Sequence, residues 1–353
     1  MLRKFFALLL CLSLVFSLGA CAAEPATPPA EDENSVPSDN ITEVAPKPED
    51  LLEFNPLTGL KDFNPEKKTA RPVAIMIDND SVAQKNAQIG VQTADVVFET
   101  EVEGGITRLM VLFADVTKAS QIGDVRSARA AFVDIATGFN AIYCHHGMDV
   151  VYCANRMKEL GTDNYVIDAS NCGWRHTYGS STNWQNLYTT GEKLWNSLTA
   201  SKWKTTQKSF DSWQTFTEDP LTLTGGAATR ATVAFNTSST SYFDYDASTG
   251  KYIKTSRLAT NKDNLTGEAY AFKNVFVLKT TMGYYSSDPH RKIDLNSGTG
   301  YYVVNGTYEK INWKKGAASN NFTFTKADGS PLTVQAGSSW VCIVKNEAEI
   351  TFN

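Results

Sequence analysis

Three acidic residues and an arginine flank a pair of glycines in the sequence. Glu99, Glu101 and Glu103 alternate before Gly104-Gly105, and Arg108 follows the glycines. Two glycines between β-forming runs predict a hairpin with a two-residue turn. Pairing across such a turn places Glu101 opposite Arg108, with all three carboxylates on the same side of the hairpin. Carboxylates beside a guanidinium can position an anion, hold a divalent ion or transfer a proton.

Two further arginines stand three positions apart, at Arg126 and Arg129. The apolar spacing around them predicts a helix over 125–138 with Asp124 as its N-cap. Cations are disfavoured in the first turns of a helix, where anions are stabilised. We therefore expect these arginines to receive a phosphate or carboxylate. In the alternative interpretation they form ion pairs inside the fold, with the glutamates of the hairpin or with Asp78.

Polar residues also follow two apolar runs that are typical of buried strands. Asp78 follows the run 73–77, and His145 and His146 follow the run 141–143. Loop histidines at strand ends can act as acids, bases or ligands. They can equally serve in capping or packing.

The cysteines and serines add no catalytic motif. Cys144, Cys153, Cys172 and Cys342 lack the close Cys-x-x-Cys pairing of a zinc site, so we expect buried thiols or one disulfide. Ser127 lacks the Gly-x-Ser-x-Gly setting of a hydrolase nucleophile. The sequence predicts neither a metal site nor a cofactor.

The elements around these residues indicate a mixed α+β protein. We predict an N-terminal α/β domain with a mixed sheet over 51–205, a connector over 206–226, and a mostly antiparallel all-β domain over 227–353. The first domain should also contain a helix near 191–198. In the second domain, Asn305-Gly306 predicts a tight hairpin turn. Short β-rich runs there lie at 232–235, 242–245, 252–255, 275–279, 300–304, 309–313, 322–325 and 340–344.

The N-terminal residues have the features of an export signal. Arg3 and Lys4 precede an apolar stretch that ends in Leu18-Gly19-Ala20-Cys21, the pattern of a bacterial lipoprotein signal. Residues 1–20 are therefore expected to be a signal peptide, with Cys21 lipidated on the outer face of the cell membrane. An acidic, proline-rich stretch follows to residue 50, and its composition predicts a disordered tether over 21–50.

The formal net charge of −5 comes from that tether. Residues 22–50 hold eight acidic residues and one lysine, which leaves 30 acidic and 30 basic residues in the rest of the mature chain. A body without net charge does not provide the basic surface of a nucleic-acid binder. An anionic ligand would have to be met by a local cluster of arginines.

Several short motifs follow one another along residues 51–353. They are Asn55-Pro56-Leu57-Thr58-Gly59, Arg71 to Asn79, Ala94 to Glu99, Glu103 to Arg108, Val125 to Arg129, Asn274 to Val277, Gly298-Thr299-Gly300, Asn305-Gly306 and Trp313-Lys314-Lys315. In this order they resemble the YerB-like bacterial lipoproteins, which pair two domains of unknown function behind a lipidated cysteine. The resemblance implies export and membrane anchoring but no particular activity. Gln185 stands where the family usually has histidine, and His145 and His146 stand where it tends to have a glycine-rich segment.

These observations favour a membrane-anchored lipoprotein that recognises an anionic ligand, such as a cell-wall polymer or an envelope protein. Arg108, Arg126 and Arg129 would contact the ligand, and the glutamates would orient them. One alternative is an envelope hydrolase or phosphotransferase that uses Asp78, Glu99 or Glu101, with or without a divalent metal. Another is a purely structural interaction protein.

Overall fold

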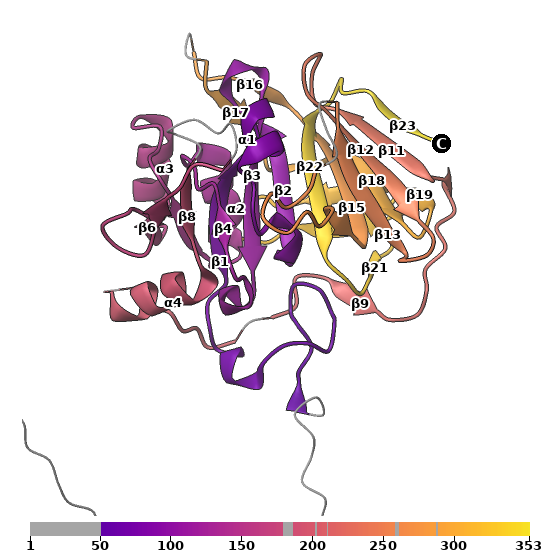
Figure 1. Ribbon diagram of the computed structural model, residues 1–353. Helices are drawn as coiled ribbons and strands as arrows, with labels where there is room; N and C mark the ends of the chain where they lie inside the picture. Colours follow the sequence, from indigo (N-terminus) through magenta and orange to yellow (C-terminus); the bar gives the residue numbers. More distant parts are fainter. Residues whose placement is uncertain (1–50, 179–185, 202, 210, 258–260, 287–288) are drawn as a thin grey trace, which may run out of the picture. The chain divides into compact units, whose positions relative to one another are not determined.

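The computed structural model describes residues 51–178, 186–201, 203–209, 211–257, 261–286 and 289–353. Within these residues, eleven strands form one mixed sheet in the order β10-β19-β18-β15-β22-β2-β3-β1-β5-β6, with β20 beside β19 (Figure 1). The strands are β1 (Val73–Asp78), β2 (Val96–Glu101), β3 (Thr107–Phe113), β5 (Ile142–His145), β6 (Asn164–Val166), β10 (Gly226–Ala227), β15 (Asn274–Thr280), β18 (Ser297–Val304), β19 (Thr307–Lys314), β20 (Thr323–Lys326) and β22 (Ser339–Lys345).

This sheet joins the N-terminal half (51–205) to the C-terminal half (227–353). β2 and β22 pair in parallel from Val96–Ser339 to Thr100–Ile343. β1, β2 and β5 also run parallel to one another, because β3 lies antiparallel between β1 and β2 and β5 pairs in parallel with β1. The carboxyl ends of β1, β2, β5 and β22 therefore meet at one edge of the sheet.

The central position of β1 follows from its sequence. Val73–Asp78 carries no alternation of polar and apolar residues, and all six residues are buried. A strand of this kind needs neighbours on both edges and cover on both faces. β3 and β5 supply the neighbours, so the predicted buried strand at 73–77 is confirmed.

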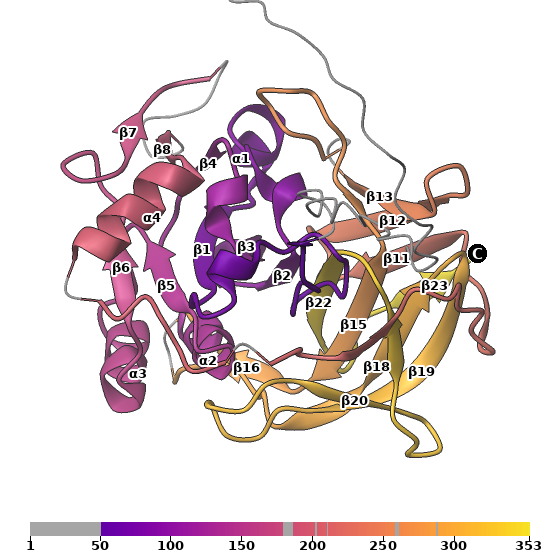
Figure 2. The same ribbon diagram turned by 90° about the horizontal axis from the view of Figure 1, so that it is seen from below.

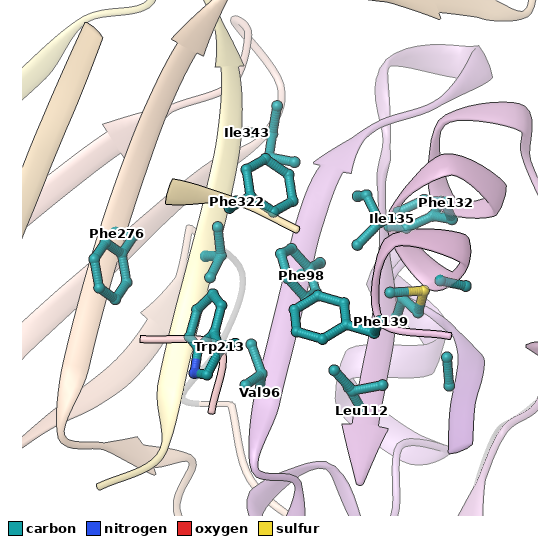
Figure 3. Packing of buried hydrophobic residues seen from close by; sticks show 14 of the residues in the cluster. Val96, Phe98, Leu112, Phe132, Ile135, Phe139, Trp213, Phe276, Phe322 and Ile343 are labelled. Atoms are coloured by element: carbon teal, nitrogen blue, oxygen red, sulfur yellow. The ribbon is translucent and has the colours of Figure 1, made fainter. Parts of the chain in front are cut away.

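One face of the sheet is covered by α2 (Ala130–Gly138) and α3 (Tyr152–Leu160). Phe98 on β2 packs against Phe139 just after α2 and against Phe322 before β20, with both ring-centroid distances at 5.8 Å (Figure 3). Trp213 continues the same cluster towards Phe276 on β15. This hydrophobic core crosses the junction of the two halves without a break.

The other face is covered by α4 (Gly191–Ala200) and by a second sheet from the C-terminal half (Figure 2). Trp340 on β22 packs between the sheets, with ring centroids 5.2 Å from Phe272 and 6.1 Å from Phe243. The second sheet has the order β14-β13-β12-β11-β23. Its strands are β11 (Arg230–Ala234), β12 (Thr240–Asp246), β13 (Lys251–Ser256), β14 (Ala271–Phe272) and β23 (Ile350–Phe352).

The remaining α-helix and strands among the described residues are short. They are α1 (Ser81–Asn86), β4 (Ile122–Gly123), β7 (Trp174–Arg175), β8 (Leu187–Thr189), β9 (Thr215–Thr217), β16 (Met282–Tyr284), β17 (Arg291–Ile293) and β21 (Thr333–Gln335). The mixed α+β class is confirmed, and each of the eight predicted β-runs of the C-terminal half falls on a strand. Asn305 and Gly306 have φ values of 50° and 72° between β18 and β19, so the predicted tight turn is also correct.

The predicted helix over 125–138 begins too early, because α2 starts at Ala130. The preceding segment is extended and bonds to other strands instead of to itself. The N–H of Val125 donates to the carbonyl of Leu187, and the N–H of Arg126 donates to that of Met76. Asp124 is therefore not an N-cap, and Arg126 does not lie in a helix.

The predicted two-residue hairpin turn is wrong by one position. Glu103–Gly105 forms a three-residue loop closed by the hydrogen bond from Val102 N–H to the Ile106 carbonyl, with φ of 74° at Gly104 and 71° at Gly105, so both positions favour glycine. Arg108 consequently pairs with Thr100, and Glu101 pairs with Thr107. A slip of one residue moves a side chain to the other face of a sheet. Arg108 therefore faces away from Glu99 and Glu101.

The signal peptide, Cys21 and the tether lie outside the described residues, as does Gln185. None of the helices among the described residues is long and apolar enough to cross a membrane. Cys144, Cys153, Cys172 and Cys342 are buried free thiols, which agrees with the first of the two alternatives for these cysteines.

Candidate functional site

The sheet edge formed by the carboxyl ends of β1, β2 and β5 holds most of the predicted site residues. Asp78 ends β1, Glu101 ends β2 and His145 ends β5. Arg108 lies at the same edge because β3 starts there. Ligands of open α/β sheets bind at the carboxyl ends of strands, so we treat this edge as the candidate site.

Asp78 holds two of the three predicted arginines. Its carboxylate is almost completely buried and lies 2.7 Å from Nε of Arg126 and 3.8 Å from a terminal nitrogen of Arg108. Arg108 is brought there by strand register, since it lies opposite Asp78 in the β1–β3 pair. Arg126 is fixed by its backbone, which bonds to Met76 on β1 and to His146 after β5. The Asp78 carboxylate is thus the ionic partner of both Arg108 and Arg126.

Arg108 has more hydrogen-bond donors than acceptors around it. Its side chain is only 3% exposed, and its one hydrogen bond among the described residues goes to the carbonyl of Ser127 at 3.2 Å. Its buried Nε finds no acceptor there. Burial lowers the pKa of Arg108, and the nearby Asp78 carboxylate opposes that shift. An incompletely paired buried guanidinium is a favourable neighbour for an anion.

Arg129, directly before the start of α2, forms an ion pair with Glu103. Its Nε donates to Glu103 at 2.8 Å, and a terminal nitrogen donates to the other carboxylate oxygen. Burial opposes ionisation of Glu103, but the hydrogen bond and charge of Arg129 dominate and lower its pKa to about 2. Arg129 is the residue just before α2 and keeps part of its side chain exposed.

Glu101 connects the N-terminal half to the C-terminal half. It accepts hydrogen bonds from Arg291 on β17 and from Asn236 after β11, the latter at 2.9 Å. Neither partner was predicted, because they lie 135 and 190 residues further along the chain. No local sequence signal could have indicated them. Arg291 is a fourth arginine at this edge.

The Glu99 carboxylate is held by hydrogen bonds from four protein side chains. Asn79, Thr107 and Ser241 donate to its carboxylate at 3.0, 2.8 and 3.1 Å, and the indole N–H of Trp340 donates at 3.0 Å. Lys254 lies 3.9 Å away. These bonds occupy both oxygens on the face of the sheet opposite Arg108. Glu99 therefore organises the junction of the two sheets and does not orient the arginines.

Asp124 is a buried carboxylic acid that the sequence indicated only as a helix cap. It is fully buried, and neither side-chain oxygen has a hydrogen-bond donor among the described residues. Burial and the nearby Asp78 carboxylate raise its pKa well above the ordinary value for aspartate. These effects favour the neutral acid. Two neighbouring carboxyl groups at this edge thus occupy very different environments.

The two histidines lie at the end of β5 and directly after it. His145 is buried, with Nδ1 2.8 Å from the carbonyl of Gly147, and burial lowers its pKa. Nδ1 of His146 lies 2.8 Å from the carbonyl of Ile167, and Arg175 donates to its Nε2 at 3.1 Å. Both rings therefore have hydrogen bonds that hold them in place. His146 adjoins the arginine cluster, because its backbone N–H donates to the carbonyl of Arg126.

The part of the chain that the structure describes contains no group of three His, Cys, Asp or Glu residues placed to hold a metal ion. The residues at this edge can instead offer guanidinium groups to an anionic ligand. We call Asp78, Arg108, Arg126, Arg129 and Glu103 the arginine cluster. Its most accessible guanidinium is that of Arg126, whose side chain is 24% exposed.

Comparison with known proteins matches most of the folded body to one family. Residues 57–204 match the family model described as "Protein of unknown function (DUF3048) N-terminal domain", and residues 231–341 match its C-terminal counterpart. The chain belongs to the DUF3048 family. Three of the sequence motifs that resemble YerB-like lipoproteins contribute residues to the arginine cluster. They are the end of Arg71–Asn79, Glu103–Arg108 and Val125–Arg129.

Similar proteins agree with this assignment to the DUF3048 family. A relative named "Putative lipoprotein YerB" from Bacillus subtilis (strain 168) is 28% identical over 304 residues, which are 82% of this chain and 85% of the relative. A crystal structure of the YerB protein from Bacillus subtilis matches with a TM-score of 0.70 and 27% identity, over 85% of this chain and 99% of that one. The resemblance to YerB-like proteins is thereby confirmed.

Proposed function

We propose that this protein is a lipid-anchored receptor on the outer face of the membrane that binds an anionic ligand at the arginine cluster. The observation that carries the proposal is Arg108, a buried guanidinium whose donors exceed its acceptors. A phosphate or carboxylate group would supply the missing acceptors. Arg126 and Arg129, which are more exposed, would contact the ligand from outside.

The charge balance at the edge supports an anion. Four guanidinium groups gather there, those of Arg108, Arg126, Arg129 and Arg291. Three carboxylates pair with them, those of Asp78, Glu101 and Glu103. The guanidinium groups thus outnumber the carboxylates that pair with them, which favours an anionic ligand at this edge.

The location rests on the N-terminal sequence and on the family. Leu18-Gly19-Ala20-Cys21 has the pattern of a lipoprotein signal, and the YerB relative is named a lipoprotein. A lipidated Cys21 followed by an acidic, proline-rich tether would hold the folded body away from the bilayer. At that position an anionic cell-wall polymer or an acidic segment of an envelope protein is an accessible ligand.

Calorimetric titration of the full-length protein in detergent with inorganic phosphate tests the proposal. We expect the wild type to bind, and Arg126→Ala to weaken binding at least about tenfold, or 1.4 kcal/mol. Arg230→Ala is the matched control, because Arg230 also pairs with a single carboxylate but lies on the far β11–β12 surface. An Arg126→Ala protein that loses stability and binds phosphate as the wild type does would exclude the anion site.

A specific observation favours acid catalysis as a second candidate function. Asp124 and Asp78 are neighbouring buried carboxyl groups. Burial and the charge of Asp78 raise the pKa of Asp124, while the Asp78 carboxylate lies 2.7 Å from Arg126 and 3.8 Å from Arg108. This division is the one expected of an acid and a charged partner in a hydrolase. We expect hydrolysis of p-nitrophenyl phosphate that is lost in Asp124→Asn. A wild type without turnover, with or without Mg²⁺, excludes this candidate.

A further inference from the structure

A pocket of about 260 Å³ opens at the same sheet edge, on the Glu99 side of the sheet. Its floor comes from the ends of β1 and β2 and from Thr107 at the start of β3. Its walls come from α1, the Gly104-Gly105 turn, the connection from β11 to β12 and the end of β13. Both halves of the chain therefore build it, and none of the arginines of the arginine cluster lines it.

The lining of this pocket is made of groups that exchange hydrogen bonds. Seven of the side chains that line it are hydroxyls, and Asn79 and Gln84 add two amides. Ile106 is the one large apolar side chain among the described residues around it. Such a lining offers many neutral donors and acceptors to a ligand but little apolar surface.

The floor is held rigidly. The Glu99 carboxylate fixes the Asn79 amide and the hydroxyls of Thr107 and Ser241. Gln84 donates to the carbonyl of Asn79 at 2.8 Å and accepts from Ser256 at 2.7 Å. Polar side chains that are locked by their own hydrogen bonds form a preorganised binding surface.

The charges around the pocket offer an anion no surplus of positive charge. Asp80 and Glu99 are acidic, Arg257 is the one basic residue among the described lining residues, and the buried Lys254 lies 3.9 Å from Glu99. The Glu99 oxygens already accept four hydrogen bonds, and one oxygen of Asp80 accepts the N–H groups of Val82 and Ala83 at the start of α1. The carboxylates of this lining are thus committed to holding protein groups, which disfavours a metal ion as well. A neutral ligand rich in hydroxyl groups fits this chemistry.

The volume sets the size of that ligand. Pockets for drug-sized molecules start at about 300 Å³, and this pocket is slightly smaller. We propose that it binds one uncharged, polyhydroxylated ring, such as a single neutral sugar residue. This site is separate from the proposed anion site, because the two lie on opposite faces of the sheet edge.

Two rim substitutions test the proposal on the full-length protein. Ser238→Trp and Ser81→Trp place an indole at the mouth from opposite halves, since both serines are exposed and line the pocket. Ser330→Trp is the matched control: its backbone N–H is held by Asp328 in the way that the N–H of Ser238 is held by Asn236. Binding is followed by saturation-transfer NMR with glucose, N-acetylglucosamine, their 6-phosphates, and a chitin trisaccharide.

We expect the neutral monosaccharides to bind the wild type, the Ser330→Trp protein and the Arg126→Ala protein alike. Each rim variant should lose at least tenfold in affinity. In the Arg126→Ala protein, where the proposed anion site is disabled, the 6-phosphates should bind at least tenfold more weakly than the parent sugars. If the trisaccharide binds more tightly than its monomer, the ring is the terminus of a glycan; equal or weaker binding indicates a free sugar. The proposal is overturned if no neutral sugar binds, if the 6-phosphates bind the Arg126→Ala protein better than the parent sugars do, or if both rim variants bind normally. Loss of phosphate binding in Arg126→Ala with unchanged sugar binding would separate the two sites.

Discussion

Arg108 lies directly opposite Asp78 in the antiparallel pairing of β1 and β3, and the Asp78 carboxylate also accepts a hydrogen bond from Arg126. The carboxylate has an exposed fraction of only 1%. Two guanidinium groups of the candidate site therefore depend on one buried negative charge.

Asp78→Asn should destabilise the protein strongly, because it leaves Arg108 buried without its ionic partner. Removing one member of a buried pair typically costs about 3–5 kcal/mol. Urea unfolding monitored by circular dichroism would measure the loss. Asp244→Asn is the control, since Asp244 pairs with Arg230 on the surface and should cost less than about 1 kcal/mol. Equal losses in the two variants would contradict the role assigned to Asp78.

Asp124→Asn should stabilise the protein, and more so at higher pH. Burial and the charge of Asp78 raise the pKa of Asp124 in the folded protein, while Asp80 adds to this shift and Arg126 opposes it. The folded state therefore holds a proton that the unfolded state releases above a pH of about 4, so this group lowers stability as pH rises. Asparagine removes that cost. The stability gap between variant and wild type should widen from pH 5 to pH 8 in urea unfolding, and a constant gap would contradict the raised pKa.

Glu103→Gln should show the opposite pH dependence. Burial alone would raise the pKa of Glu103, but the bonds from Arg129 lower it to about 2. The ion pair therefore stabilises the fold above the ordinary pKa of glutamate, and this stability is lost as pH falls towards 2. We expect a cost of about 1–2 kcal/mol at pH 7, reduced by partial solvent exposure, and almost none near pH 2. Thermal unfolding at both pH values would measure it, and a cost that persists at low pH would show a role unrelated to charge.

The sequence predicted elements better than it predicted which side chains meet. The apolar run at 73–77 has only one stable environment, a strand covered on both faces, so β1 could be predicted. The register after β2 depends on how Gly104 and Gly105 turn, and a difference of one residue moved Arg108 to the other face. Periodicity cannot fix such a choice, because both turns suit the same residues.

The start of α2 and the environment of Asp124 were missed for a different reason. The segment before Ala130 has helical spacing, but its N–H groups bond to the carbonyls of Met76 and Leu187. These partners lie far along the chain, and tertiary bonds override local propensity. The arginine pairs themselves were anticipated in one of the two interpretations, since Arg126 binds Asp78 and Arg129 binds Glu103.

The two halves of the chain should fold only together. β2 would lose β22 along five residue pairs if the chain ended at 205, and its backbone would form an exposed sheet edge. Phe98 would also lose its contact with Phe322, and Trp340 would lose the Glu99 carboxylate to which it donates. We expect residues 51–205 and 227–353 to aggregate or remain unfolded when expressed alone. A single polypeptide over 51–353 should show one cooperative unfolding transition by calorimetry. Two well-separated transitions, or a soluble N-terminal half with dispersed NMR signals, would contradict a shared core.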